Sequence, residues 1–174
     1  MTKRIAALLT VLMIAWSMDC MAANIDRINS DDHVLERSEI ALGGIMVGMT
    51  RAQAEGICGK PTARRIVVIK GTSRDYGKLY MYVYGTSLQV TYNKDVVMLM
   101  YLDASESSGV ATPAGVTVGD PEDKVTQIYG TPWCYTKDDR GEENFVYRDK
   151  GGDTKLIFGV ENGRVIYIGI IGEE

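Results

Sequence analysis

The sequence predicts an α+β protein of two tandem repeats, each a short helical segment followed by an antiparallel meander of up to four strands. The first observation is internal similarity, because the block from Gly44 to Pro61 recurs 71 positions later, from Gly115 to Pro132. The second is that strand-like segments rich in Val, Ile, Tyr and Met follow each block. The third is that 45% of the 174 residues are hydrophobic, enough to bury a sizeable core. We therefore expect the helices to pack on one face of a single curved sheet.

Residues 1–23 have the pattern of a secretory signal peptide. Basic residues at 3–4 precede an apolar run at 5–16, and small residues follow at Ala22 and Ala23. The run has about 12 residues, whereas a helix that crosses a bilayer needs about 20. We expect cleavage after Ala22 or Ala23, and an exported protein of the periplasm, the cell envelope or the extracellular space.

The three cysteines bear on what happens after export. A lipid-anchored protein is cut just before a cysteine that follows a small residue, whereas Asp19 precedes Cys20, so a lipid anchor is disfavoured. Cys58 and Cys134 remain in the processed chain, one in each half. They either form a disulfide that joins the halves, as an oxidising compartment permits, or stay as inert buried thiols.

Each repeat opens with signals for a short helix. Thr50 followed by Gln53 predicts a capping box, in which each residue satisfies a backbone donor of the first turn. In the second copy we expect Asp120 to cap the helix and Pro121 to occupy the first helical position. A glycine followed two residues later by a proline should end both helices.

Four strands are expected after each helix. In the first half they span 64–70, 79–84, 88–92 and 96–102, and in the second half 133–136, 144–148, 155–160 and 165–171. The pair Asn162-Gly163 predicts a tight hairpin, since both residue types tolerate the positive φ of a primed turn.

A small, polar segment separates the two halves of the chain. The expected organisation is a signal peptide at 1–23, a polar lead-in at 24–38, a first repeat at 39–103, a linker at 104–110 and a second repeat at 111–174.

The repeated block resembles a known family. A turn at Gly48-Met49-Thr50, a short helix with Gln53 and a stop at Gly59-Lys60-Pro61 are similar to the SmpA/OmlA family of bacterial envelope proteins, which includes BamE of the outer-membrane assembly machinery. Two such units in tandem resemble the fold of the secreted β-lactamase inhibitor protein. The resemblance covers roughly residues 40–171, although the second copy has Asp120-Pro121 in place of Met-Thr. It implies protein binding, with no catalytic residues to carry over.

Composition excludes several functions. With 19 Lys and Arg against 23 Asp and Glu, the net charge of -4 offers no cationic field for nucleic acid. His33 is the single histidine of the chain and lies in the polar lead-in, which leaves few options for a nucleophile and base pair. We expect no enzymatic activity, no cofactor, no metal site and no membrane span in the processed chain.

The candidate binding residues are aromatic. Tyr80, Tyr82 and Tyr84 alternate with Met81 and Val83, so the three phenols share one face of a strand. If Met81 and Val83 pack beneath the helix, the tyrosines lie on the open face of the sheet, where they would suit a protein interface. The alternative is that they simply fill a half-buried sheet.

Three further aromatic residues belong with this set. Tyr92 and Tyr101 could extend the stripe, and Trp133 either anchors a partner or, as is favoured, packs in the core. The sequence thus predicts a non-catalytic, exported module that binds another protein with its open sheet face. The alternatives are a scaffold of outer-membrane assembly, or a protein inhibitor of a secreted enzyme such as a β-lactamase.

Overall fold

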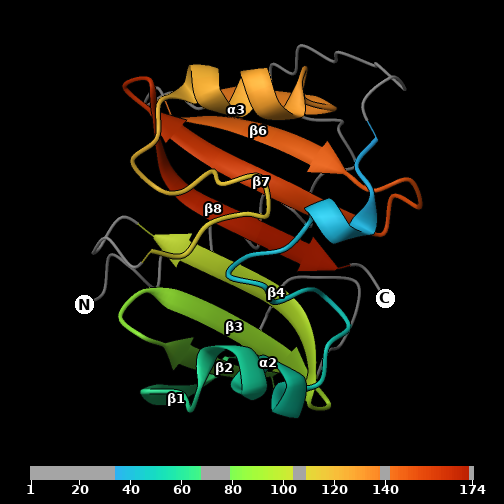
Figure 1. Cartoon of the computed structure of the whole chain (residues 1–174), viewed down its shortest axis with the longest axis vertical. Helices are drawn as coiled ribbons and strands as arrows, with labels where there is room; N and C mark the ends of the chain where they lie inside the picture. Colours follow the sequence, from blue (N-terminus) through green and yellow to red (C-terminus); the bar gives the residue numbers. More distant parts are fainter. Residues whose placement is uncertain (1–33, 68–78, 104–108, 138–141, 173–174) are drawn as a thin grey trace.

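A computed structural model describes residues 34–67, 79–103, 109–137 and 142–172. They form one antiparallel sheet of eight strands, with two α-helices on one of its faces (Figure 1). The α+β class is therefore confirmed. The expected signal peptide at 1–23, most of the lead-in and most of the linker lie outside the described residues.

The elements follow the order helix, four strands, helix, four strands. A 3-10 turn, η1 (Arg37–Glu39), precedes them. The first group is α2 (Arg51–Cys58), β1 (Ala63–Val67), β2 (Leu79–Tyr84), β3 (Leu88–Asn93) and β4 (Val96–Asp103). The second group is α3 (Glu122–Tyr129), β5 (Cys134–Lys137), β6 (Glu143–Arg148), β7 (Thr154–Glu161) and β8 (Arg164–Gly172).

The spatial order of the strands is β1-β2-β3-β4-β8-β7-β6-β5. Each group of four is an antiparallel meander, and the last strands of the two groups, β4 and β8, pair at the centre. In Figure 1 the two helices lie over opposite ends of the sheet, and the segments that lead into them cross its middle. These segments touch there, because the Gly43 amide donates to the Ala111 carbonyl at 2.9 Å.

The start of α2 is as predicted. The Thr50 hydroxyl accepts from the Gln53 amide at 3.3 Å, and the Gln53 side chain accepts from the Thr50 amide at 2.8 Å. The start of α3 differs from the prediction, because Pro121 is the N-cap and Asp120 lies one residue earlier. The Asp120 carboxylate is occupied elsewhere: it accepts from the Thr117 amide and from Lys124 Nζ, both at 2.8 Å.

Both helices are tied to the last hairpin of their own group in the same way. The Arg51 amide donates to the Asp95 carbonyl at 2.9 Å, and the Glu122 amide donates to the Gly163 carbonyl at 3.0 Å. Arg51 and Glu122 therefore occupy corresponding positions, as do Asp95 and Gly163.

The larger core lies between the sheet and the helices. It joins Ala54 of α2 and Val125 of α3 to side chains of β2, β3, β4, β6, β7 and β8. A second cluster lies on the other face of the sheet and consists of Met81, Leu99, Tyr101, Cys134, Val146, Ile157, Tyr167 and Ile171. Within the described part of the chain, no helix contributes to this second cluster.

Candidate functional site

The predicted tyrosine stripe lies on the face that the helices cover, not on the opposite one. Tyr82, Tyr84 and Tyr92 are buried in the larger core together with Ala54 of α2, whereas Met81 belongs to the second cluster. The expectation that these tyrosines lie on the open face of the sheet is therefore wrong. The rings are tolerated in the core because their polar ends find partners, as in the hydroxyl pair of Tyr84 and Tyr92 at 2.8 Å.

The other three predicted aromatic residues are separated from one another. Tyr80 is half-buried at the outer end of the same row as Tyr82. Tyr101 lies on the second face, only 2% exposed, with its ring 5.4 Å from that of Tyr167. Trp133 is half-buried against the second cluster, with the Arg148 guanidinium 4.9 Å from its ring centroid. The six residues therefore do not form one surface.

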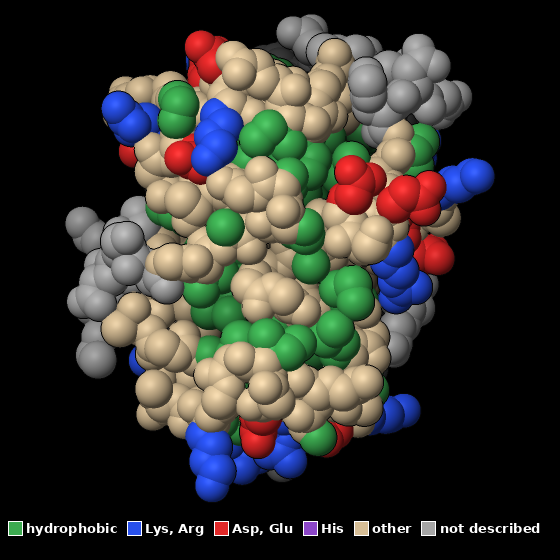
Figure 2. Space-filling model, in the orientation of Figure 1, with side chains coloured by type: hydrophobic (Ala, Val, Ile, Leu, Met, Phe, Trp, Pro, Cys, Tyr) green, Lys and Arg blue, Asp and Glu red, His purple; other side chains and the backbone are tan. Residues whose placement is uncertain are grey.

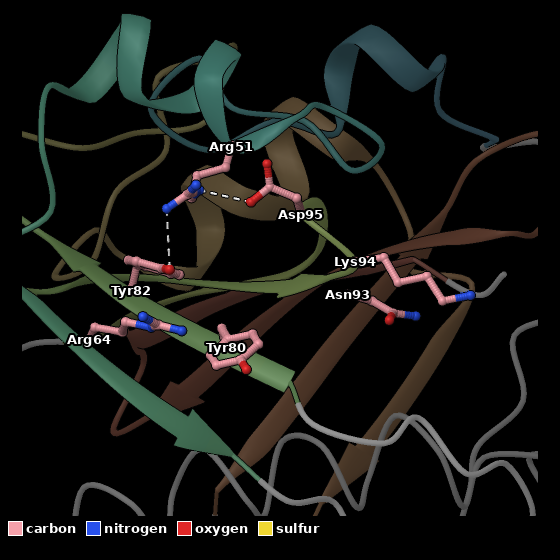
Figure 3. A pocket seen from close by; sticks show the side chains of 7 residues that line it. All are labelled: Arg51, Arg64, Tyr80, Tyr82, Asn93, Lys94 and Asp95. Carbon is pink, nitrogen blue, oxygen red and sulfur yellow. Dashed lines mark hydrogen bonds and ion pairs between the residues drawn. The ribbon is translucent and has the colours of Figure 1, made fainter.

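Tyr80 and Tyr82 do line a pocket of about 600 Å³ beside the edge strand β1 (Figure 3). Its walls come from the start of α2, from β1, from β2 and from the turn between β3 and β4. The lining residues are Arg51, Arg64, Tyr80, Tyr82, Asn93, Lys94 and Asp95. Figure 2 shows several Lys and Arg side chains at the α2 end of the molecule.

Arg51 is held in place at the back of this pocket. Its Nε lies 2.8 Å from Asp95 Oδ1, and its Nη1 donates to the Tyr82 hydroxyl at 3.3 Å. A longer ion pair joins Nε to Glu55 Oε1 at 3.9 Å. The Asp95 carboxylate raises the pKa of Arg51 above its usual value. The charge of Arg51 is thus balanced within the chain.

Arg64 is placed differently. Its guanidinium carbon lies 4.3 Å from the centroid of the Tyr80 ring and 5.6 Å from that of Tyr82, which is cation–π geometry. Arg64 and Lys94 are both exposed, and neither forms an ion pair with any residue that the structure describes. The pocket therefore presents two cations that the described carboxylates do not neutralise.

The turn that carries Lys94 is unusual for its residue types. Lys94 has φ 46° and Asp95 has φ 73°, both in the left-handed region that non-glycine residues seldom adopt. The corresponding turn between β7 and β8 uses Asn162 and Gly163, which suit that conformation. The first turn thus keeps two charged residues at the pocket in place of the residues that its backbone prefers.

The cysteines lie too far apart to pair. Cys58 ends α2 and packs against the larger core, whereas Cys134 begins β5, at the other edge of the sheet and on its other face. No disulfide joins them. The predicted alternative of a disulfide between the halves is therefore wrong, because the two residues lie on opposite faces of the sheet. Burial raises the pKa of the Cys58 thiol, which makes it less reactive.

Other site chemistry is limited in the described part of the chain. It holds no group of three His, Cys, Asp or Glu side chains able to bind a metal ion. His33 lies outside the described residues. Among the helices that the structure describes, none is long and apolar enough to span a membrane.

Comparison with known proteins gives a likeness of fold alone. No protein-family model matches the chain, and no curated protein matches it significantly by sequence. A cysteine-rich secretory protein from Staphylococcus aureus aligns at 13% identity with a TM-score of 0.49, over 80% of this chain and 50% of that one. An extracellular protein with an SCP domain from Bacillus anthracis aligns at 12% identity with a TM-score of 0.48, over 87% and 50%.

A candidate β-lactamase inhibitor protein from Streptococcus mutans also aligns, at 14% identity with a TM-score of 0.31, over 73% of this chain and 85% of that one. The chain spans half the length of the Staphylococcus and Bacillus proteins. At these identities and scores the alignments do not transfer a function. The resemblance to the SmpA/OmlA family stays a prediction.

Proposed function

We propose that this chain is an exported, non-catalytic module that binds another protein, with the pocket beside β1 at the centre of the interface. The observation that carries the proposal is the exposed Arg64 stacked on the half-buried Tyr80 at the rim of that pocket. Arginine and tyrosine are among the residue types that contribute most to binding energy at protein interfaces, and they do so around partly enclosed pockets.

The location of this interface departs from the open sheet face that the sequence suggested. Two aromatic rings of that face, Tyr101 and Tyr167, are 2% and 4% exposed in the 174-residue chain, and Trp133 beside them is half-buried. In the same chain Arg64 is exposed and Tyr80 is half-buried, so both side chains reach solvent. The pocket beside β1 is therefore the better-supported contact surface.

The proposal includes two SmpA/OmlA-like repeats, at 39–103 and 111–174. Support comes from the matching hydrogen bonds that tie Arg51 to Asp95 and Glu122 to Gly163. The raised pKa of Cys58 disfavours this thiol as a nucleophile, which agrees with a non-catalytic role. Export rests on the signal-peptide pattern of residues 1–23.

The test is capture of a partner by the processed protein from envelope and secreted fractions of its host. Wild type is compared with Tyr80→Ala and with Arg65→Ala, whose side chain lies on the other face of β1. We expect a protein that is captured by wild type and by Arg65→Ala but lost with Tyr80→Ala. Equal capture by all three folded variants would place the interface elsewhere, and no capture by wild type would refute the proposal.

The captured protein then separates a scaffold from an inhibitor. If the role is outer-membrane assembly, the chain and its partner should co-fractionate with outer membranes. If the role is inhibition, adding the chain should abolish the activity of a secreted enzyme, such as a β-lactamase, at one-to-one stoichiometry. If the enzyme activity is lost only at a large molar excess of the chain over the enzyme, inhibition by a tight one-to-one complex is contradicted.

A further inference from the structure

The charge of the pocket beside β1 is opposite to that of the protein. The whole chain has a net charge of -4, yet the pocket lining contains the cations Arg51, Arg64 and Lys94 and the single carboxylate of Asp95. That carboxylate lies 2.8 Å from Arg51 Nε. Arg64 and Lys94 are therefore the charges available to a bound group. A local excess of cations on an acidic protein favours an anionic ligand at this place.

Arg64 is arranged to bind a planar anion. Contact with the Tyr80 ring at 4.3 Å restrains the guanidinium, and a guanidinium held against a ring can still donate hydrogen bonds from its N–H edge. Such an edge matches the two oxygens of a carboxylate, and these charge-assisted bonds are stronger than neutral ones. Because stacking already restrains this long side chain, less conformational entropy is lost when it binds.

Lys94 adds a second observation that is independent of Arg64. The turn holds it at φ 46°, although the corresponding turn of the second half shows that Asn162 fits the same position. Residues held in uncommon backbone conformations cluster at binding sites, where their placement has a use. Lys94 lines the pocket from this turn, and in Figure 3 its side chain extends away from Arg64 and Tyr80.

We propose that the pocket binds a carboxylate group from an acidic segment of the partner protein, with Arg64 as the contacting cation and Lys94 as a second positive charge in the pocket lining. The Tyr80 ring contacts the Arg64 guanidinium and would also contact the apolar part of the bound segment. Arg51 is a positioning residue, since its Nε pairs with Asp95 and its Nη1 donates to the Tyr82 hydroxyl. This proposal rests on the proposed protein-binding function and names the chemistry of the partner.

The test is a titration of the full processed protein with a short blocked peptide, acetyl-Gly-Glu-Glu-Gly-amide, followed by NMR or calorimetry. The matched control peptide has Gln in place of both Glu residues. We expect binding of the Glu peptide that weakens with salt, and that falls about tenfold or more in Arg64→Ala and in Lys94→Gln. Arg65→Ala removes the same charge from the neighbouring position and should bind as wild type does.

Four results would overturn the carboxylate proposal, three of them in the peptide titration. These three are equal binding of the Gln peptide, equal weakening by Arg64→Ala and Arg65→Ala, and no binding of the Glu peptide. Tighter binding of inorganic phosphate than of the Glu peptide would also overturn it. Circular dichroism of each variant verifies that the sheet is intact, which is expected because Arg64 and Lys94 are exposed.

Partner capture with the same variants separates the two proposals. A partner retained by Arg64→Ala overturns the carboxylate contact and leaves the protein-binding function standing. Binding of the Glu peptide without capture of any protein has the opposite meaning, because the carboxylate site then stands and the protein-binding function fails.

Discussion

Replacing Lys94 by Asn should make the protein more stable. An L-residue in the left-handed region costs about 1–2 kcal/mol, and Asn is several-fold enriched there because its short side chain fits. With Lys94 at φ 46°, we expect Lys94→Asn to raise the free energy of unfolding by about 0.5–1 kcal/mol. For a protein of this size, that change raises Tm by roughly 1–4 °C.

The assay is urea unfolding monitored by circular dichroism, with two matched variants. Asn162→Lys makes the reverse change at φ 53° in the corresponding turn, and should lower the free energy of unfolding by a similar amount. Lys94→Gln removes the charge without the turn preference of Asn, so it measures what charge removal alone does. The reasoning is refuted if Lys94→Asn is no more stable than Lys94→Gln, or if Asn162→Lys unfolds at the same urea concentration as wild type.

Three further predictions concern buried and half-buried groups. Tyr92→Phe should lower the free energy of unfolding by about 1–2 kcal/mol because it removes the hydrogen-bond partner of the buried Tyr84 hydroxyl. In a double-mutant cycle, adding Tyr84→Phe to this variant should restore part of the lost stability. Burial pushes the pKa of Asp120 up, but the Lys124 and backbone hydrogen bonds outweigh this and lower it. Wild type should therefore have a higher free energy of unfolding than Asp120→Asn at any pH above the pKa of Asp120 in the unfolded chain. This difference should vanish as the pH falls through the pKa of Asp120 in the folded protein, and a difference that persists in acid contradicts the prediction. Cys58, whose pKa burial raises, should react with Ellman's reagent more slowly at pH 7 than an exposed cysteine of a model peptide; an equal rate would disprove its inertness.

Most strands could be predicted closely from the sequence because they are short apolar runs between turn residues, whereas the edge strand β1 contains two arginines and is mostly exposed. The hairpin at Asn162-Gly163 is an example, since both residues adopt the positive φ that their types favour. The alternation at Tyr80, Tyr82 and Tyr84 also gave the correct partition into two faces.

What the alternation could not give was which face the helix covers. Both faces of β2 are apolar enough to be buried, since Met81 and Tyr82 are 3% and 7% exposed. The alternation of side chains separates the two faces of a strand but does not identify the face that a helix covers. That depends on where α2 crosses the sheet. The same ambiguity explains the cysteines, because the spacing of Cys58 and Cys134 does not tell which side of the sheet each approaches.

The pocket beside β1 could not be assembled from neighbouring residues in the sequence. Its charged residues are Arg51, Arg64, Lys94 and Asp95, which come from a helix start, an edge strand and a turn. They meet only because β1, β2 and β3 are neighbours in the sheet and the hairpin after β3 is tied to the start of α2. One signal was present in retrospect: Lys94-Asp95 stands where the other half has Asn162-Gly163.

The central position of β8 has a consequence for how the chain matures during synthesis. β8 pairs with both β4 and β7, so the two meanders are joined only through a strand that lies at residues 164–172. Among the described strands β8 is synthesised last, and until it is made the chain has two unjoined sheets with open edges at β4 and β7. Completion of the eight-stranded sheet is thereby postponed until β8 has been synthesised, so neither meander gains its final neighbours on its own.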